Sequence, residues 1–120
     1  MAEKDLCAQA LAIGEYVMGA FFVQAGNLVH WRMREGLKLP DSEKTSALMF
    51  QRTLIHGMLK MREEYVGKMY FAMSSYEHMD IFHFGIEDAK PTILIVTVRQ
   101  PYEMQDFVPK AMRLVSRAGS

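Results

Sequence analysis

The side chains in this sequence that could carry out chemistry are one cysteine and four histidines. His30, His56, His78 and His83 have no spacing that would place two metal ligands on one helix face, and Cys7 has no second cysteine beside it. A Cys7 nucleophile would need a base and an oxyanion site, and Cys7 lies near the apolar stripe of a terminal helix, where thiols are usually inert. We therefore expect no metal, no cofactor and no catalytic cysteine, with His30 and His83 on solvated or partly buried strand faces.

Nucleotide hydrolysis would need a loop that holds phosphate groups. Neither Gly-x-x-x-x-Gly-Lys nor Gly-x-Gly-x-x-Gly occurs, so the chain could act only on another protein's nucleotide. An arginine donated to a GTPase can stabilise the transferring phosphoryl group. Five arginines are candidates, each expected to be a solvated surface charge: Arg32, Arg34, Arg52, Arg62 and Arg99. No nucleophile, base and orienting group can be named together, so we predict that the protein is not an enzyme.

Length and composition predict one domain over residues 1–120, with half of the residues hydrophobic. Fourteen basic and fourteen acidic residues leave a net charge of zero, which argues against nucleic acid as a partner. One cysteine cannot form an intrachain disulfide, and the first eleven residues lack a signal-peptide pattern, so we expect a cytoplasmic protein. The apolar runs are too short for a membrane span.

Hydrophobic periodicity predicts the order helix, two strands, helix, three strands, helix. The elements are expected over residues 3–17, 20–25, 28–34, about 42–65, 68–76, 79–86, 92–99 and from 107 onward.

Several boundaries carry turn or capping residues. Gly26-Asn27 separates the strands of the first hairpin, and the acidic and polar segment 40–43 can start the second helix. Gly67 can close that helix. Asp106 is the expected N-cap of the last helix, which places Pro109 in its first turn.

The strand over residues 92–99 is apolar on both faces, so it belongs in the middle of a sheet that is covered on both sides. We therefore predict an α+β fold in which a five-stranded, mainly antiparallel sheet lies between helices, an α/β/α sandwich.

The second helix has more apolar surface than one sheet contact needs. One band holds Ala47, Phe50, Leu54, Met58, Met61 and Tyr65, and a second band holds Leu48, Ile55 and Leu59. Gln51 and Arg62 separate the bands, which together cover about half of the circumference. Once the sheet is covered, the remaining surface is either hidden within the monomer, by a loop such as residues 36–39 or by a helix end, or packed against another chain. The following strand can lie at a sheet edge that a partner extends.

Residues 17–29 carry a resemblance to a known family. A hydrophobic residue before Gly19-Ala20, an apolar strand, the turn glycine Gly26 and a second strand resemble the opening hairpin of Roadblock/LC7 domains. The order of the elements matches over almost the whole chain. Two features depart from the pattern: the connection over residues 35–40 is longer and more basic and apolar, and Gln24-Ala25 replaces an acidic turn residue.

The resemblance implies a fold similar to longin and profilin-like domains. The sheet order would be 2-1-5-4-3, with the second helix on one face and the outer helices on the other. Family members typically dimerise by pairing their third strands and packing their second helices. On this chain the implied interface is Leu48, Ile55, Leu59, Arg62, Lys68, Tyr70, Ala72 and Ser74.

The resemblance also implies a non-catalytic homodimeric adaptor that regulates a small Ras-like GTPase, as MglB-like regulators do, or a scaffold in a signalling or motor complex. A small-molecule sensor of the PAS or GAF type, built on a similar sheet flanked by helices, is the alternative. A small enzyme is the third possibility, and the one that the residues favour least.

Overall fold

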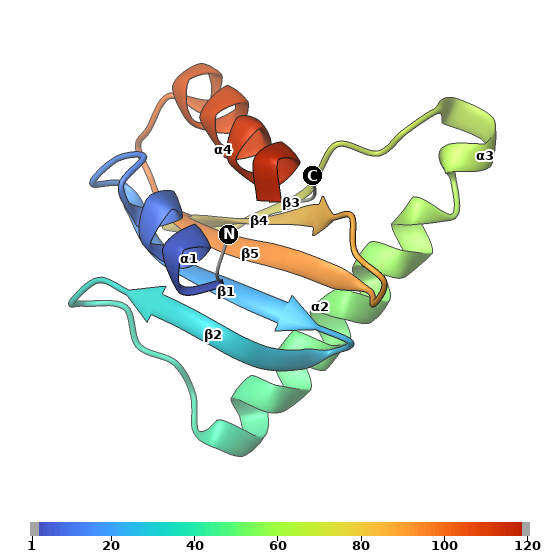
Figure 1. The fold of residues 1–120 in the computed structure, drawn as a ribbon. Helices are drawn as coiled ribbons and strands as arrows, with labels where there is room; N and C mark the ends of the chain where they lie inside the picture. Colours follow the sequence, from blue (N-terminus) through green and yellow to red (C-terminus); the bar gives the residue numbers. More distant parts are fainter. Residues whose placement is uncertain (1–2, 119–120) are drawn as a thin grey trace.

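Five strands form one antiparallel sheet with helices on both faces in the computed structural model, which describes residues 3–118 (Figure 1). The elements are α1 Glu3–Leu11, β1 Val17–Gln24, β2 Asn27–Met33, α2 Ser42–Lys60, α3 Glu63–Val66, β3 Ala72–Ser75, β4 Met79–Ile86, β5 Thr92–Arg99 and α4 Met104–Ala118. The strand order is β2-β1-β5-β4-β3, and every neighbouring pair is antiparallel. The predicted fold class and the sheet order implied by the resemblance are both confirmed.

The two faces of the sheet are covered differently. Helices α1 and α4 lie on one face and α2 lies on the other (Figure 1). The α1/α4 side holds the larger core, in which Phe82, Phe84 and Phe107 pack ring against ring. The α2 side holds a small cluster of Phe21, Val23, Met49, Ile93 and Ile95. Strand β5 is the middle strand, as predicted, and supplies apolar side chains to both faces.

Helix α1 ends at Leu11, although its apolar pattern predicted a helix to residue 17. The Arg34 guanidinium donates hydrogen bonds to the backbone oxygens of Leu11, Gly14 and Val17, at 2.5, 3.1 and 2.7 Å. These bonds satisfy carbonyls that a longer helix would have used internally. Val17 therefore begins β1, and Arg34 is half-buried instead of being the solvated charge that we expected.

The β1–β2 hairpin turns one residue earlier than predicted. Ala25 and Gly26 occupy the turn with φ values of 52° and 83°, a left-handed pair that suits a two-residue hairpin loop. Gly26 adopts this conformation without strain, and Phe50 of α2 lies where a side chain at Gly26 would project.

Helix α2 begins as predicted and ends earlier. The Asp41 carboxylate caps it by accepting from the Lys44 N–H at 2.9 Å. The helix stops at Lys60, and the short α3 follows until Gly67, at φ 94°, closes it. The Met69 N–H then donates to the Glu63 carboxylate at 2.8 Å, which ties the next segment to α3 instead of to the sheet. Strand β3 consequently covers Ala72–Ser75, not the predicted 68–76.

Helix α4 begins two residues before the predicted N-cap. Asp106 lies in its first turn, where the carboxylate pairs with Lys110 at 2.9 Å and accepts from the Tyr16 hydroxyl at 2.8 Å. Pro109 is therefore the sixth residue of the helix and lies beyond the first turn.

Candidate interaction surface

The side of α2 that faces the sheet is mostly polar. Thr45, Met49 and His56 are its buried residues, and Arg52 is half-buried among them. Their spacing of four, three and four residues places all of them on one stripe of the helix. One apolar band of this helix was predicted to cover the sheet. This prediction is wrong, because the stripe of α2 that contacts the sheet is the polar one and both apolar bands lie elsewhere on the helix.

Both apolar bands of α2 consequently face solvent. In the first band, Phe50 is 55% exposed and Met58 is 68% exposed, and Tyr65 in α3 continues the band at 82%. In the second band, Leu48, Ile55 and Leu59 are 36–40% exposed. Figure 1 shows α2 and α3 extending along the outside of the molecule. Exposed apolar side chains that lie together on one side of a protein are typical of an interaction site.

The loop over residues 36–39 does not cover these bands. Leu37 and Leu39 pack against the cluster on the sheet that contains Phe21 and Val23. Leu37 occupies the space beside Gly19 where a side chain would project. Within residues 3–118, the intrachain explanation for the surplus apolar surface is therefore not realised.

Arg52 connects α2 to the edge strand of the sheet. Its guanidinium donates to the Ser74 hydroxyl and the Tyr76 hydroxyl, both at 3.0 Å, and lies 3.3 Å from the Nε2 of His83. Arg52 was predicted to be a solvated surface charge, and this prediction is wrong because Arg52 is half-buried. Its place on the stripe with Thr45 and His56 is the signal that would have identified it.

The two histidines beneath α2 are held in the neutral form. Burial, the Arg52 charge and His56 lower the pKa of His83 to about 4. Burial and the charge of Lys60 lower the pKa of His56. His83 is buried, at 2% exposure, which corrects the expectation of a solvated or partly buried position, whereas His30 is half-buried as expected.

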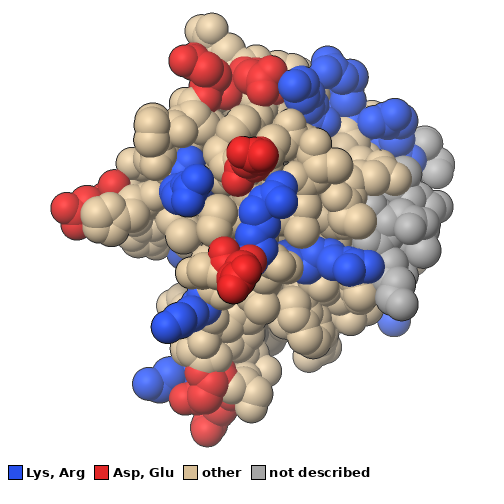
Figure 2. Space-filling view, turned by 90° about the vertical axis from the view of Figure 1, so that its left-hand side faces the viewer, with Lys and Arg blue, Asp and Glu red and all other residues tan. Residues whose placement is uncertain are grey.

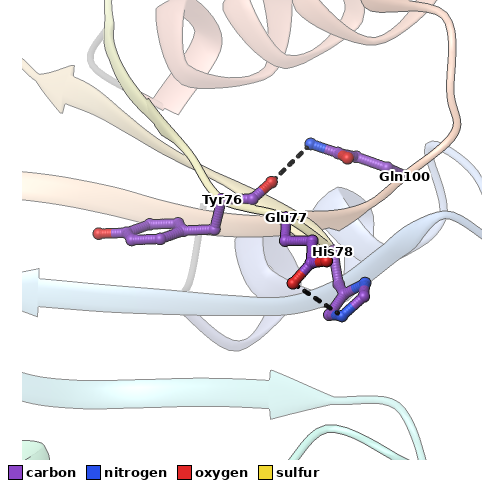
Figure 3. Close-up of polar contacts among 4 residues, drawn as sticks. All are labelled: Tyr76, Glu77, His78 and Gln100. Carbon is purple, nitrogen blue, oxygen red and sulfur yellow. Dashed lines mark hydrogen bonds and ion pairs between the residues drawn. The ribbon is translucent and has the colours of Figure 1, made fainter.

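Gln100 fastens the β3–β4 turn to the end of β5. Its side-chain amide donates to the backbone oxygen of Tyr76 at 3.1 Å (Figure 3). The same amide donates to the Asp80 carboxylate at 2.7 Å. Burial alone would raise the pKa of Asp80, but hydrogen bonds from Ser75, Tyr102 and Gln100 outweigh burial and lower it. The Glu77–His78 pair at the tip of the turn is exposed. Arg52 and Gln100 thus hold β3 from its two sides.

Solved structures of Roadblock/LC7 and Mgl proteins share this fold. The Roadblock/LC7 domain from Streptomyces avermitilis aligns with a TM-score of 0.76 at 9% identity, over 98% of this chain and 95% of that one. Myxococcus xanthus MglB aligns with a TM-score of 0.73 at 9% identity, over 99% and 95%. A structure of MglB in a tetrameric arrangement aligns with a TM-score of 0.73 at 9% identity, over 96% and 83%.

The chain has the Roadblock/LC7 fold. At this identity the likeness shows the fold alone, and no protein-family model and no curated protein matches the sequence.

On this Roadblock fold, the residues of the implied interface lie on α2, α3 and the segment that leads into β3. Leu48, Ile55, Leu59 and Arg62 are exposed along the helices. Ala72 and Ser74 are half-buried in β3, at the edge of the sheet. Lys68 and Tyr70 are exposed but precede the strand, so strand pairing could involve only the last part of the predicted segment. The Arg52–Ser74 bond places the α2 residues and β3 on the same side of the molecule.

In the part of the chain that the structure describes, no three His, Cys, Asp or Glu side chains are placed to hold a metal ion. Cys7 is fully buried in α1. Figure 2 shows acidic and basic side chains interspersed over one side of the molecule, without a patch of a single sign. No helix within residues 3–118 has the length and apolar character needed to cross a membrane.

Proposed function

We propose that this protein is a cytoplasmic, non-catalytic adaptor or regulator that consists of a single Roadblock-like domain and forms a homodimer. The interface consists of the flank of α2 with Leu48, Ile55 and Leu59, continued by Arg62 and by the segment from Lys68 to the β3 edge. The observation that carries the proposal is the orientation of α2, which turns polar residues to the sheet and apolar residues to solvent.

Two further facts support self-association. MglB, which shares this fold, has been solved in a tetrameric arrangement, so one protein of this fold assembles with itself. A net charge of zero leaves little repulsion between copies. The first band, with Phe50, Leu54 and Met58, points away from the sheet and stays exposed when a second copy covers the flank. We assign that band to the partner protein.

Sedimentation at micromolar concentration tests the homodimer. We expect a dimer for the native chain and a monomer when Leu48, Ile55 and Leu59 are all changed to Glu, because carboxylates buried in an apolar contact cost several kcal/mol. The matched control carries Glu at Phe50, Leu54 and Met58 in the same helix and should remain dimeric. If the native chain sediments only as a monomer, the proposed homodimer is contradicted.

The partner class comes from the family resemblance, which implies a small Ras-like GTPase. Capture from the native organism with the immobilised chain should recover such a GTPase, and the variant with Glu at Phe50, Leu54 and Met58 should fail to recover it. If that variant recovers the GTPase as well as the native chain does, the GTPase does not bind at the first band. Arg34 and Arg52 are held by intrachain hydrogen bonds, so of the five candidate arginines Arg32, Arg62 and Arg99 remain exposed.

A small-molecule sensor is the second candidate, favoured by one groove. The groove measures about 590 Å³ and lies between the end of α2, the β4–β5 turn and α4. His56 and Lys60 line it on one side, and Glu87 and Lys90 line it on the other. A metabolite that stays bound in native mass spectra of the purified protein would favour this candidate over the adaptor.

A further inference from the structure

Strand β2 forms the edge of the sheet opposite to β3, and it lies outside the proposed dimer interface (Figure 1). It pairs with β1 on one side, and no described strand pairs with its outer side. Three large apolar side chains are exposed along it: Val29 at 44%, Trp31 at 45% and Met33 at 38%.

The register shows which backbone groups face this open edge. The Arg34 N–H donates to the Met18 carbonyl at 2.8 Å, so it points toward β1. In an antiparallel ladder, successive residues turn their N–H and C=O groups to opposite sides. Trp31 and Met33 therefore direct their backbone groups outward, where an added strand could pair with them.

The two faces of β2 differ in chemistry. Trp31 lies directly opposite Phe21 and Met33 lies opposite Gly19, on the face that α2 covers. Arg32 lies opposite Ala20, on the other face, where it is exposed and forms no ion pair with a side chain of residues 6–118. Residues 27–33 contain no acidic side chain. The edge thus offers an apolar row on one face and a basic charge on the other.

We propose that the outer edge of β2 binds an extended peptide segment of another protein, in which apolar and acidic residues alternate. The segment adds a sixth strand to the sheet. Its apolar side chains pack beside Trp31 and Met33, and an acidic side chain lies across from Arg32, because directly opposed residues share a face. The backbone bonds supply affinity and the alternating side chains supply specificity.

A second copy of the chain fits this edge less well. Two copies that join at this edge would pair antiparallel about a two-fold axis. A pairing centred on Arg32 would set the two Arg32 side chains against each other. Like charges that are directly opposed across strands destabilise the pairing, so the charge of β2 favours an acidic segment over itself.

The single tryptophan makes the test direct, because all tryptophan emission comes from Trp31. We would titrate the full chain with a short blocked peptide that alternates valine and glutamate, and with its valine–lysine counterpart. Binding should shift the Trp31 emission to shorter wavelength, with the glutamate peptide about tenfold tighter. Methylation of alternate peptide amide nitrogens should abolish the shift.

Two variants decide between charge recognition and simple apolar contact. Arg32→Glu should reverse the preference in favour of the lysine peptide, whereas Arg99→Glu, the same change at the exposed end of β5, should leave it unaltered. The variant with Glu at Leu48, Ile55 and Leu59 should bind the peptide normally, so loss of the dimer and loss of this site are distinguishable. The proposal would be overturned by any of three results. These are equal affinity for both peptides, no binding of either peptide, and an emission shift that depends only on protein concentration.

Discussion

At the residue scale, His83 is a buried titratable side chain whose pKa lies far below its ordinary value. It lies between α2 and the sheet, 3.3 Å from the Arg52 guanidinium, with its ring centroid 6.3 Å from that of His56. A proton on His83 would place a second positive charge beside Arg52 in a buried site. The folded chain therefore holds His83 neutral, and its pKa is about 4 instead of the ordinary 6.5.

The lowered pKa of His83 predicts a pH-dependent stability. The unfolded chain takes up the proton near pH 6.5, whereas the folded chain resists it until about pH 4. The contribution of His83 to the free energy of unfolding should thus have its full value above pH 6.5. It should be lost between pH 6.5 and 4, a decrease on the order of 3 kcal/mol. Urea unfolding at a series of pH values measures this loss.

Substitutions at two histidines separate this effect from the general effect of acid. His83→Asn should make the stability curve less steep between pH 6.5 and 5, a range above the titration of Asp80, and the lowered pKa of His56 accounts for the slope that remains. His78→Asn, at the exposed tip of the β3–β4 turn, should leave the curve as it is in the native chain. A His83→Asn curve that falls as steeply as the native one contradicts the assignment.

At the element scale, α2 shows what the sequence could predict and what it could not. Its start at Asp41 and the central β5 were predicted because capping chemistry and an apolar run on both faces are local signals. The orientation of α2 was not predicted, because helical periodicity separates the faces without showing which one meets the sheet. Polar partners on β3 and β4 hold Arg52 inward, and no local pattern contains such partners.

Long-range contacts explain the other differences. The apolar stripe predicted a first helix that extends to residue 17. However, Arg34, which follows the first hairpin, donates hydrogen bonds to the carbonyls of Leu11 and Gly14, and the helix ends at Leu11. The alternating segment from residue 68 looked like a strand, but its first residues are bonded to α3. The residues of the candidate surface that lie on α2 could be named from the sequence. The contact of Arg52 with the sheet could be recognised only from its place on the helix stripe that also holds Thr45 and His56.

The connection between α2 and β3 predicts the effect of removing Arg52. Arg52→Gln deprives the Ser74 and Tyr76 hydroxyls of their donor and should lower the free energy of unfolding by about 1–3 kcal/mol. Arg99→Gln, at an exposed position, should change it by less than about 0.5 kcal/mol. Both values come from urea unfolding at pH 7 and the same protein concentration. Equal values for the two variants would mean that Arg52 does not hold β3 to α2.

At the scale of the whole molecule, the sheet has two open edges with different chemistry. The β3 edge is short and lies beside the exposed flank of α2, whereas the β2 edge carries Trp31 and Arg32. A homodimer that uses the β3 edge would leave β2 at the two outer ends of the joined sheet. Self-association and peptide binding could then occur together, because they use opposite edges.

The β3 edge can be tested by a single proline. The Tyr76 N–H donates to the Met79 carbonyl at 2.8 Å, so the alternation turns the Ser74 N–H toward β4 and the Met73 N–H toward the open edge. Met73→Pro removes a donor that the monomer does not use, and proline is tolerated on edge strands. The variant should keep its fold by circular dichroism and sediment as a monomer at micromolar concentration.

Ser74→Pro is the matched contrast, one residue further along the same strand. It removes a backbone donor that pairs with β4 and also the hydroxyl that accepts from Arg52, so it should lower the free energy of unfolding by about 1 kcal/mol or more. Met73→Pro should cost less than Ser74→Pro in stability and more in dimerisation, because the two backbone donors point to opposite sides of β3. A Met73→Pro chain that remains dimeric would show that the copies associate through α2 without pairing their third strands.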